Sequence, residues 1–183
     1  MKSVPNQYGV YPPVYSPGRK VLENFEKFRG CLCWNDHRHE LVNELESLIN
    51  IVKDPIGIRA AWIGGSFLTE KDHPDDIDVT FILDGTKVEN IPEDSVGLRK
   101  LITAPGLKDL ANRRGLRIDP YVVVWKPAIK GLTPDTDDYH RWRGYWDDFW
   151  QRQRQGEKES EPDLSWTLPR QGYVEVIVNG YQW

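Results

Sequence analysis

Two aspartates, Asp76 and Asp78, stand two positions apart at the start of an apolar run that ends at Leu83. Side chains two positions apart on a strand point to the same face of a sheet, so these carboxylates should converge on one point. Neighbouring carboxylates repel each other and raise each other's pKa, which makes the pair costly to keep for stability alone. A divalent cation relieves that repulsion, and carboxylate oxygens suit Mg²⁺ or Mn²⁺. The spacing therefore predicts a metal site.

A third carboxylate, Asp119, occurs in a valine-rich segment, Leu116–Trp125, that the sequence predicts to be a further strand. If this strand lies beside Ile77–Leu83, Asp119 completes an acidic triad with Asp76 and Asp78. Two metal ions held by such a triad could activate an attacking hydroxyl and stabilise a leaving pyrophosphate. We therefore expect all three aspartates to be catalytic residues and metal ligands.

A glycine-rich turn precedes the acidic pair. The predicted strand Ile58–Ile63 runs directly into Gly64-Gly65-Ser66. Such a turn offers free backbone N–H groups, a hydroxyl and no bulky side chain, which suits close approach by a phosphate chain. Lys71 lies in the loop that follows, where it could meet a phosphate, although loop lysines are usually only solvated.

The turn and the acidic pair together resemble the signature of the DNA polymerase beta-like nucleotidyltransferase superfamily. That signature is an apolar strand, Gly-Gly or Gly-Ser, a short gap, and two acids around one apolar residue. Here nine residues separate Gly64-Gly65-Ser66 from Asp76-Ile77-Asp78, and the resemblance covers Ala60 to Val124. The segment from Gly65 to Thr69, read with Pro74 to Asp78, looks like a small bacterial and phage branch of the superfamily.

The resemblance implies a nucleotidyltransferase fold, a small mixed β-sheet flanked by helices. The glycine turn (Gly64, Gly65, Ser66), with Lys71, would bind a nucleoside triphosphate such as ATP. Asp76 and Asp78 would hold Mg²⁺, and Asp119 would help to activate the acceptor. The implied reaction moves a nucleotidyl group to a hydroxyl of RNA (a tRNA end, for example), of a protein or of a small molecule. A toxin–antitoxin or phage-defence setting is implied by resemblance as well.

Two other functions remain open on the same residues. One is a catalytically inactive member of the fold that binds and regulates a partner protein. The other is a metal-dependent phosphoesterase, since paired aspartates and Mg²⁺ serve that chemistry too. The orientation of Asp119 bears on the choice, because a triad that does not face one point weakens the transferase hypothesis.

Hydrophobic spacing and turn residues predict one α/β (α+β) domain over residues 19–183, preceded by an irregular, proline-rich arm over residues 1–18. An added C-terminal helix and strand follow the sheet. Pro55 and Gly57 should end the second helix, and Pro105 should break or restart the third. The predicted helices are Arg19–Phe28, Asp36–Lys53, Asp94–Arg114 and Thr133 to about Gln153; the predicted strands are Ile58–Ile63, Ile77–Leu83, Leu116–Trp125 and Gly172–Val178.

Composition narrows the class of protein. The 183 residues include 39% hydrophobic and 28% charged residues and 8 tryptophans, which excludes wholesale disorder. The formal net charge of −4 argues against a sequence-blind nucleic-acid binder. The absence of a long apolar run and of a secretory signal predicts a cytoplasmic protein with no membrane association. Cys31 and Cys33 are expected to be reduced thiols rather than part of a metal site with His37 and His39.

The last predicted helix is rich in aromatic and basic residues. Trp142, Trp146 and Trp150 recur at every fourth position. We interpret them as a stripe that packs on the core, with a platform for stacked bases as the alternative. The arginines of this region are interpreted as a solvated face balanced by nearby aspartates; they are Arg141, Arg143, Arg152 and Arg154.

Overall fold

A five-stranded sheet, flanked by helices, forms the centre of the computed structural model, which describes residues 3–126, 138–157, 159–161 and 163–181. The strands are β1 (Gly18–Leu22), β2 (Ile58–Ile63), β3 (Ile77–Asp84), β4 (Ile118–Trp125) and β5 (Gly172–Ile177). The α-helices are α1 (Phe25–Leu32), α2 (Asp36–Ile56), α3 (Gly85–Glu89), α4 (Val96–Leu101), α5 (Ala104–Arg113) and α6 (Asp138–Gln151). Two short 3₁₀ helices, η1 (Gly65–Leu68) and η2 (Leu164–Thr167), lie in connecting segments.

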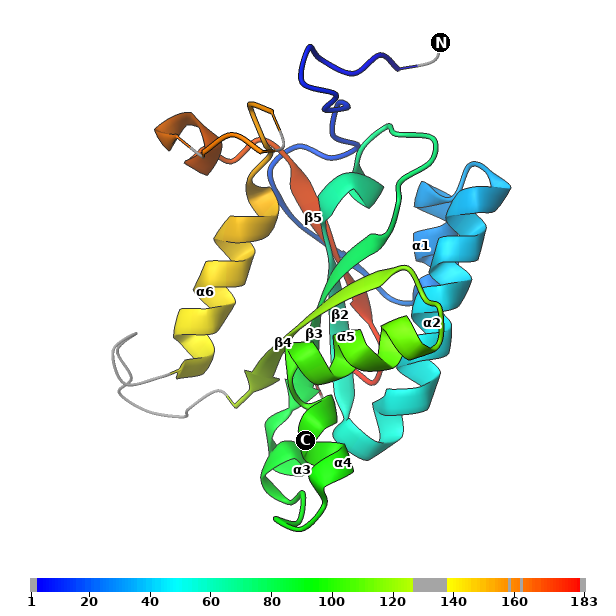
Figure 1. Ribbon diagram of the computed structural model, residues 1–183, viewed down its shortest axis with the longest axis vertical. Helices are drawn as coiled ribbons and strands as arrows, with labels where there is room; N and C mark the ends of the chain where they lie inside the picture. Colours follow the sequence, from blue (N-terminus) through cyan, green and yellow to red (C-terminus); the bar gives the residue numbers. More distant parts are fainter. Residues whose placement is uncertain (1–2, 127–137, 158, 162, 182–183) are drawn as a thin grey trace.

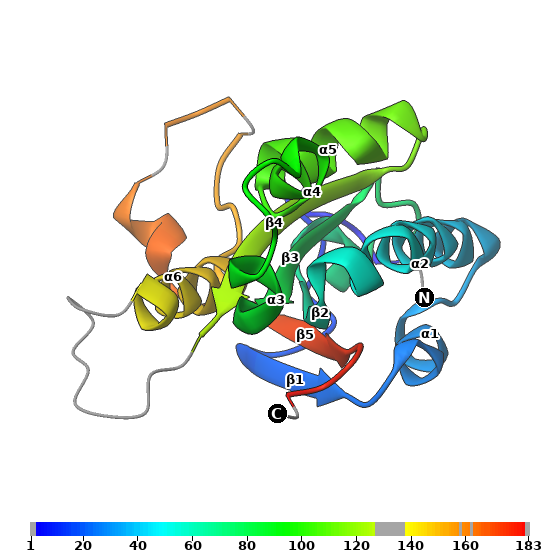
Figure 2. The same ribbon diagram turned by 90° about the horizontal axis from the view of Figure 1, so that it is seen from below.

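The sheet is mixed, with strand order β1-β5-β2-β3-β4 (Figures 1 and 2). β5, β2 and β3 pair antiparallel in turn, whereas the two edge strands run parallel to their neighbours, β1 to β5 and β4 to β3. The β3–β4 register places Asp78 directly beside Asp119. The expected mixed sheet flanked by helices is therefore confirmed.

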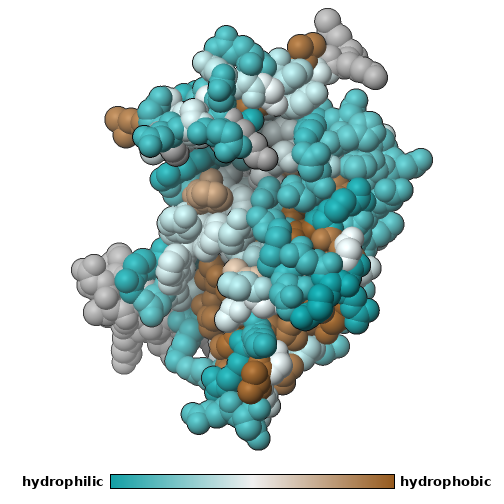
Figure 3. All heavy atoms as spheres, in the orientation of Figure 1, coloured by the Kyte–Doolittle hydropathy of each residue, from teal (hydrophilic) through white to brown (hydrophobic). Residues whose placement is uncertain are grey.

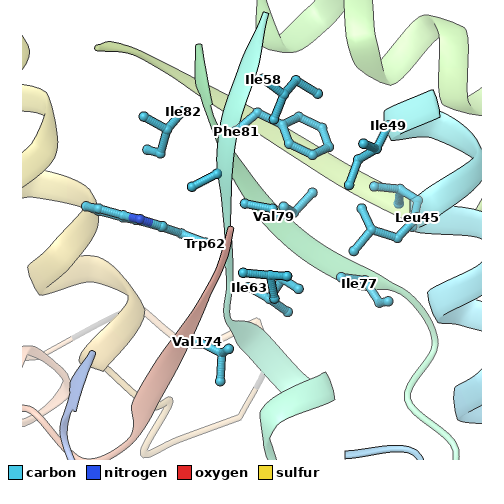
Figure 4. Close-up of a cluster of buried hydrophobic side chains, with 14 of the residues drawn as sticks. Leu45, Ile49, Ile58, Trp62, Ile63, Ile77, Val79, Phe81, Ile82 and Val174 are labelled. Atoms are coloured by element: carbon cyan, nitrogen blue, oxygen red, sulfur yellow. The ribbon is translucent and has the colours of Figure 1, made fainter. Parts of the chain in front are cut away.

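The core lies on both faces of this sheet. Ile77, Val79 and Phe81 of β3 point toward α2, where Leu45 and Ile49 meet them (Figure 4). Because side chains alternate along a strand, the other face carries a different set. There Trp62 and Ile82 point toward α6, and both are buried (Figure 4). Helices α1 and α2 thus cover one face and α6 the other, as Figure 2 shows.

The helix predicted over Arg19–Phe28 is wrong. Residues 18–22 form β1, which pairs with β5, and the helix begins only after Asn24, whose side chain accepts a hydrogen bond from the backbone N–H of Lys27. An Asn cap of this kind fixes the start of a helix. The strand is specified by pairing with residues that lie far along the chain, which local spacing does not reveal.

Several predicted boundaries shift. Pro55 does not end α2, which continues to Ile56 and stops at Gly57, whose φ of 68° is left-handed. The predicted helix 94–114 begins at Val96 and is two helices, and the restart expected at Pro105 is confirmed, since the second helix starts at a Thr103 cap with Pro105 in its first turn. α3 was not predicted. The start predicted at Thr133 lies outside the described residues; β4 begins two residues later than expected and β5 ends one earlier.

The N-terminal arm, described from Ser3, is irregular as expected, but it is fastened to the domain. The backbone N–H of Val14 donates to Leu68 (2.9 Å), and that of Glu70 donates to Pro12 (2.9 Å). Pro13 forms an isolated β-bridge with Thr69. The arm therefore runs along the loop that follows the glycine turn.

The surface seen in Figure 3 is mostly hydrophilic, and hydrophobic residues gather between α6 and α5, over the C-terminal half of β4. Among the described residues, no helix combines the length and the apolar character needed to cross a membrane.

Candidate functional site

The predicted acids lie on the face of the sheet that α6 covers. Asp78, Thr80 and Ile82 alternate with the residues of β3 that face α2, and Trp150 of α6 donates from its indole Nε1 to the Thr80 hydroxyl (3.0 Å). Asp119 of β4 is the register partner of Asp78, so both project from the same face. The pairing of β3 with β4 is thus what brings the third acid to the first two.

The glycine turn is built around the Asp78 carboxylate. Gly65 has a φ of 65°, and a Cβ added there would overlap the Oδ2 atom of Asp78. A Cβ at Gly64 would overlap the indole ring of Trp150, and the Gly64 N–H donates to the Asp78 carbonyl (3.1 Å). Both positions require glycine for space, and Gly65 also requires it for backbone conformation.

The turn and the acidic pair open into a cavity of about 700 Å³. Five of the predicted site residues line it: Gly65, Ser66, Lys71, Asp76 and Asp78. Gly64 does not, because it is buried behind Trp150, and Asp119 also lies outside the lining. The volume falls in the range of small-molecule sites, which run from ~300 to ~1,000 Å³.

Burial and mutual repulsion disfavour the charged forms of the two acids. Burial, followed by the charges of Asp76 and Asp119, raises the pKa of Asp78 to about 7, against an ordinary value of 3.8. The pKa of Asp76 is raised by burial and then by Asp119. Lys108 opposes both shifts. The three carboxylates therefore act on one another electrostatically, which is the arrangement that a cation would stabilise.

Asp119 has partners that the sequence did not suggest. Lys108 Nζ of α5 contacts its Oδ1 atom at 2.6 Å, and the Tyr121 hydroxyl donates to its Oδ2 atom at 3.0 Å. Burial and this hydrogen bond raise the pKa of Tyr121, so the phenol stays protonated and keeps donating. A lysine thus occupies part of the coordination space of the third acid.

The donor chemistry fits a hard divalent cation, since the carboxylate residues Asp76 and Asp78 both line the cavity. Within the described residues, no group of three or more His, Cys, Asp or Glu side chains is arranged to hold a metal ion. Asp76 and Asp78 line the cavity, and Asp119 is paired with Lys108 beside them. Cys31 and Cys33 are free thiols at the end of α1.

A buried arginine holds the loop between the two motifs. The guanidinium of Arg38 donates to the carbonyls of Leu32 (2.6 Å), Lys71 (2.8 Å) and Phe67. It is stacked between the rings of Trp34 and Phe67, and its burial lowers its pKa to about 10. Arg38 thereby ties the end of α1 to the first half of the loop between the glycine turn and the acidic pair. Sequence reasoning missed it, because an arginine in an amphipathic helix resembles a surface residue.

Lys71 lines the cavity, and its Nζ atom contacts the Asp75 carboxylate at 2.8 Å. Asp75 is exposed and also lines the cavity. The position of Lys71 is therefore compatible with the predicted phosphate contact. A bound phosphate would replace the exposed Asp75 carboxylate as the partner of Lys71.

The aromatic stripe of α6 is rotated relative to the prediction. Trp146 and Trp150 are buried with Tyr139, but Trp142 is 51% exposed. Residues four apart drift by about 40° around an α-helix, so a stripe at every fourth position leaves the buried face within two steps. The prediction that Trp142 packs on the core is wrong.

The cavity also includes residues that the sequence did not assign to a site. They come from the arm (Gly9, Val10, Tyr11), from the end of α6 and the segment after it (Phe149, Trp150, Arg152, Gln153, Arg154), and from Asp163, Trp166, Thr167 and Gln171. The interpretation of Arg154 as part of a solvated face is wrong, because this side chain is half-buried in the cavity wall. Arg152 forms an ion pair with Asp148, as expected for an arginine balanced by a nearby aspartate.

A family model described as a family of unknown function (DUF6932) matches residues 6–177. Comparisons with curated proteins and with solved structures gave no match. The matched range includes the glycine turn, the three acids and most of the arm.

Proposed function

We propose that this chain, which belongs to the DUF6932 family of unknown function, is a metal-dependent nucleotidyltransferase of the polymerase beta-like type. It would transfer a nucleotidyl group from a nucleoside triphosphate to a hydroxyl and release pyrophosphate. One observation carries the proposal: the Asp78 carboxylate lies against Gly65 of the glycine turn, in a cavity that Asp76 shares. Phosphate-binding turn and metal-binding acids thus meet at one place.

The glycine turn and the three acids would have different roles in this reaction. The N–H groups and hydroxyl at Gly65 and Ser66 would bind the phosphates, and Asp76 and Asp78 would hold Mg²⁺ or Mn²⁺. When bound, the ion supplies positive charge that offsets the two carboxylates and the charge that develops on the leaving pyrophosphate. Asp119, next to Asp78 on β4, would take up the acceptor proton.

In the proposed step, the acceptor hydroxyl oxygen attacks the α-phosphorus. The new O–P bond forms as the bond from this phosphorus to the pyrophosphate oxygen breaks, and the hydroxyl proton passes to Asp119. Tyr121, which already donates to Asp119, would help to orient this carboxylate. The acceptor belongs to RNA, a protein or a small molecule, and the toxin–antitoxin or phage-defence setting implied by resemblance belongs to the proposal too.

The Lys108–Asp119 contact favours one alternative, a catalytically silent member of the fold that binds a partner protein. A lysine on the third acid stands where a catalyst would need a free carboxylate. In an active enzyme Asp119 exchanges Lys108 for the metal or for the acceptor, whereas in a silent binding module the contact persists.

The deciding experiment is incubation of the full chain with Mg²⁺, each α-³²P-labelled nucleoside triphosphate, and total cellular RNA or protein. We expect label to pass to one acceptor with the wild type and not with Asp76→Asn or Asp78→Asn. Asp109→Asn is the matched control, because Asp109 is an exposed α5 carboxylate paired with Arg113 and lies outside the cavity lining. Release of inorganic phosphate without label transfer would indicate the phosphoesterase. Absence of both, with no nucleotide binding, would overturn the enzyme proposal and favour the binding module.

A further inference from the structure

The cavity wall that faces away from the sheet is made by two segments that the glycine and aspartate motifs do not include. Figure 1 shows the arm and the segment after α6 near each other above the sheet. Gln153 Nε2 donates to the carbonyl of Tyr11 (2.9 Å), and Arg154 Nη2 donates to the carbonyl of Tyr8 (3.3 Å). These bonds join the two segments along the cavity.

Both segments are held in place by further hydrogen bonds. The arm makes a turn in which the Asn6 side chain accepts from the N–H groups of Tyr8 (2.9 Å) and Val10 (3.0 Å). The chain after α6 is held by residues that lead into β5, because the N–H of Arg170 donates to the carbonyl of Gln151 (2.8 Å). Arg154 therefore projects from a fixed backbone, not from a free tail.

Arg154 differs from the other cations of the cavity. Lys71 contacts Asp75, and Arg152 contacts Asp148, whereas Arg154 has no carboxylate within ion-pair distance among the residues that the structure describes. Its Nε atom is buried and has no hydrogen-bond partner there. A half-buried guanidinium without an anionic partner leaves its charge uncompensated, so an anionic ligand in this cavity would be bound favourably.

The chemistry of the guanidinium identifies that ligand. Arginine presents parallel N–H donors that match the oxygens of a phosphate, and such charge-assisted pairs are stronger than neutral hydrogen bonds. The same cavity contains the glycine turn and the acidic pair at another part of its lining. We infer that Arg154 binds the terminal phosphates of the nucleoside triphosphate. This inference rests on the proposed function, since that function supplies the triphosphate.

The test measures binding of ATP, AMP and inorganic tripolyphosphate to the full chain by isothermal titration calorimetry with Mg²⁺. We expect Arg154→Ala to weaken ATP and tripolyphosphate binding about 10- to 100-fold and AMP binding less than twofold. The ATP affinity of Arg154→Lys should lie between those of the wild type and Arg154→Ala, because lysine keeps the charge but not the planar guanidinium. Arg141→Ala, which removes an exposed arginine paired with Asp138 outside the cavity lining, should leave all three affinities unchanged.

A merely structural role for Arg154 would give a different result. Removal of residues 1–8 takes away the Tyr8 carbonyl but leaves Arg154 in place, so this variant should keep most of the preference for ATP over AMP. If the truncated chain and Arg154→Ala both lose AMP together with ATP, Arg154 acts only by holding the arm, and the inference is overturned. Equal affinities of Arg154→Ala and wild type for ATP and tripolyphosphate would overturn it as well.

The outcomes also separate this inference from the proposed function. Arg154-dependent tripolyphosphate binding without nucleotidyl transfer would refute the enzyme and support the anion site. Nucleotidyl transfer by the wild type, together with full ATP affinity in Arg154→Ala, would support the enzyme and refute the anion site at Arg154. If the wild type binds none of the three probes, both fail. A single-stranded oligonucleotide that competes with tripolyphosphate, while ATP does not, would assign the site to acceptor phosphates and overturn the assignment to the triphosphate.

Discussion

Asp78→Asn should make the metal-free protein more stable while abolishing its response to metal. In the folded protein the pKa of Asp78 is about 7, against 3.8 ordinarily, because burial and the neighbouring acids disfavour its charge. The folded state therefore binds a proton between these two values that the unfolded state has released. It follows that stability falls as pH rises from about 4 to about 7 and is then level.

The shift sets the size of the effect. Three pKa units correspond to about 4 kcal/mol of lost stability at pH 8.5, and the loss is close to zero at pH 4. An Asn side chain carries no charge but still buries a polar amide, which reduces the gain. We expect Asp78→Asn to raise the free energy of unfolding by roughly 2 to 4 kcal/mol at pH 8.5 and by much less at pH 4.

The assay is urea denaturation followed by tryptophan fluorescence at several pH values, with EDTA and then with Mg²⁺. With EDTA the variant should be the more stable protein above pH 7. With Mg²⁺ at about 100 times its dissociation constant the wild type should gain about 3 kcal/mol and the variant nothing. Asp109→Asn serves as the control, because an exposed ion pair contributes little. A variant that is less stable than the wild type at pH 8.5 in EDTA would refute this reasoning about the buried charge.

Three further predictions concern the groups around the acids. Gly65→Ala should destabilise the protein by about 1 to 3 kcal/mol in urea denaturation, because the new Cβ overlaps the Asp78 carboxylate at a left-handed φ; unchanged stability would show that the turn is free to move. Lys108→Met should raise the apparent Mg²⁺ affinity severalfold in a melting-temperature titration, since the lysine competes for Asp119; weaker Mg²⁺ binding would mean that Lys108 supports the site. Arg38→Lys should cost about 3 kcal/mol or more and open the loop it holds to protease, because a buried ammonium does not replace a guanidinium bonded to three carbonyls; protease resistance equal to the wild type would contradict that role.

The parts of the site that sequence predicted are those set by short spacing. The positions of Asp76 and Asp78 follow from the two-residue period of a strand, and the turn at Gly65 follows from residue type. Asp119 required one further step, the assumption that two valine-rich strands are neighbours, and the parallel register of β3 and β4 meets it. Local rules were sufficient wherever the functional groups lie within one strand or its turn.

The predictions that are wrong concern residues whose structure depends on contacts with segments far along the chain. β1 reads as a helix because its pairing partner, β5, is some 150 residues away along the chain. Arg154 reads as a solvated arginine because the arm that covers it, at Tyr8, lies at the other end of the sequence. No sequence pattern indicates a role for Lys108, because its contact with Asp119 depends on how α5 packs on β4. Long-range packing, which no local pattern encodes, sets all three.

The acidic site is a poor solution for stability, and this is the strongest argument that it is a functional one. A half-buried Asp78 with a pKa near 7 weakens the folded state at neutral pH, and the two glycines that space requires lose more conformational freedom on folding than other residues would. Lys108 relieves only part of this repulsion from its place on Asp119. A bound cation would relieve the rest, so a ligand of positive charge accounts for features that the fold alone does not explain.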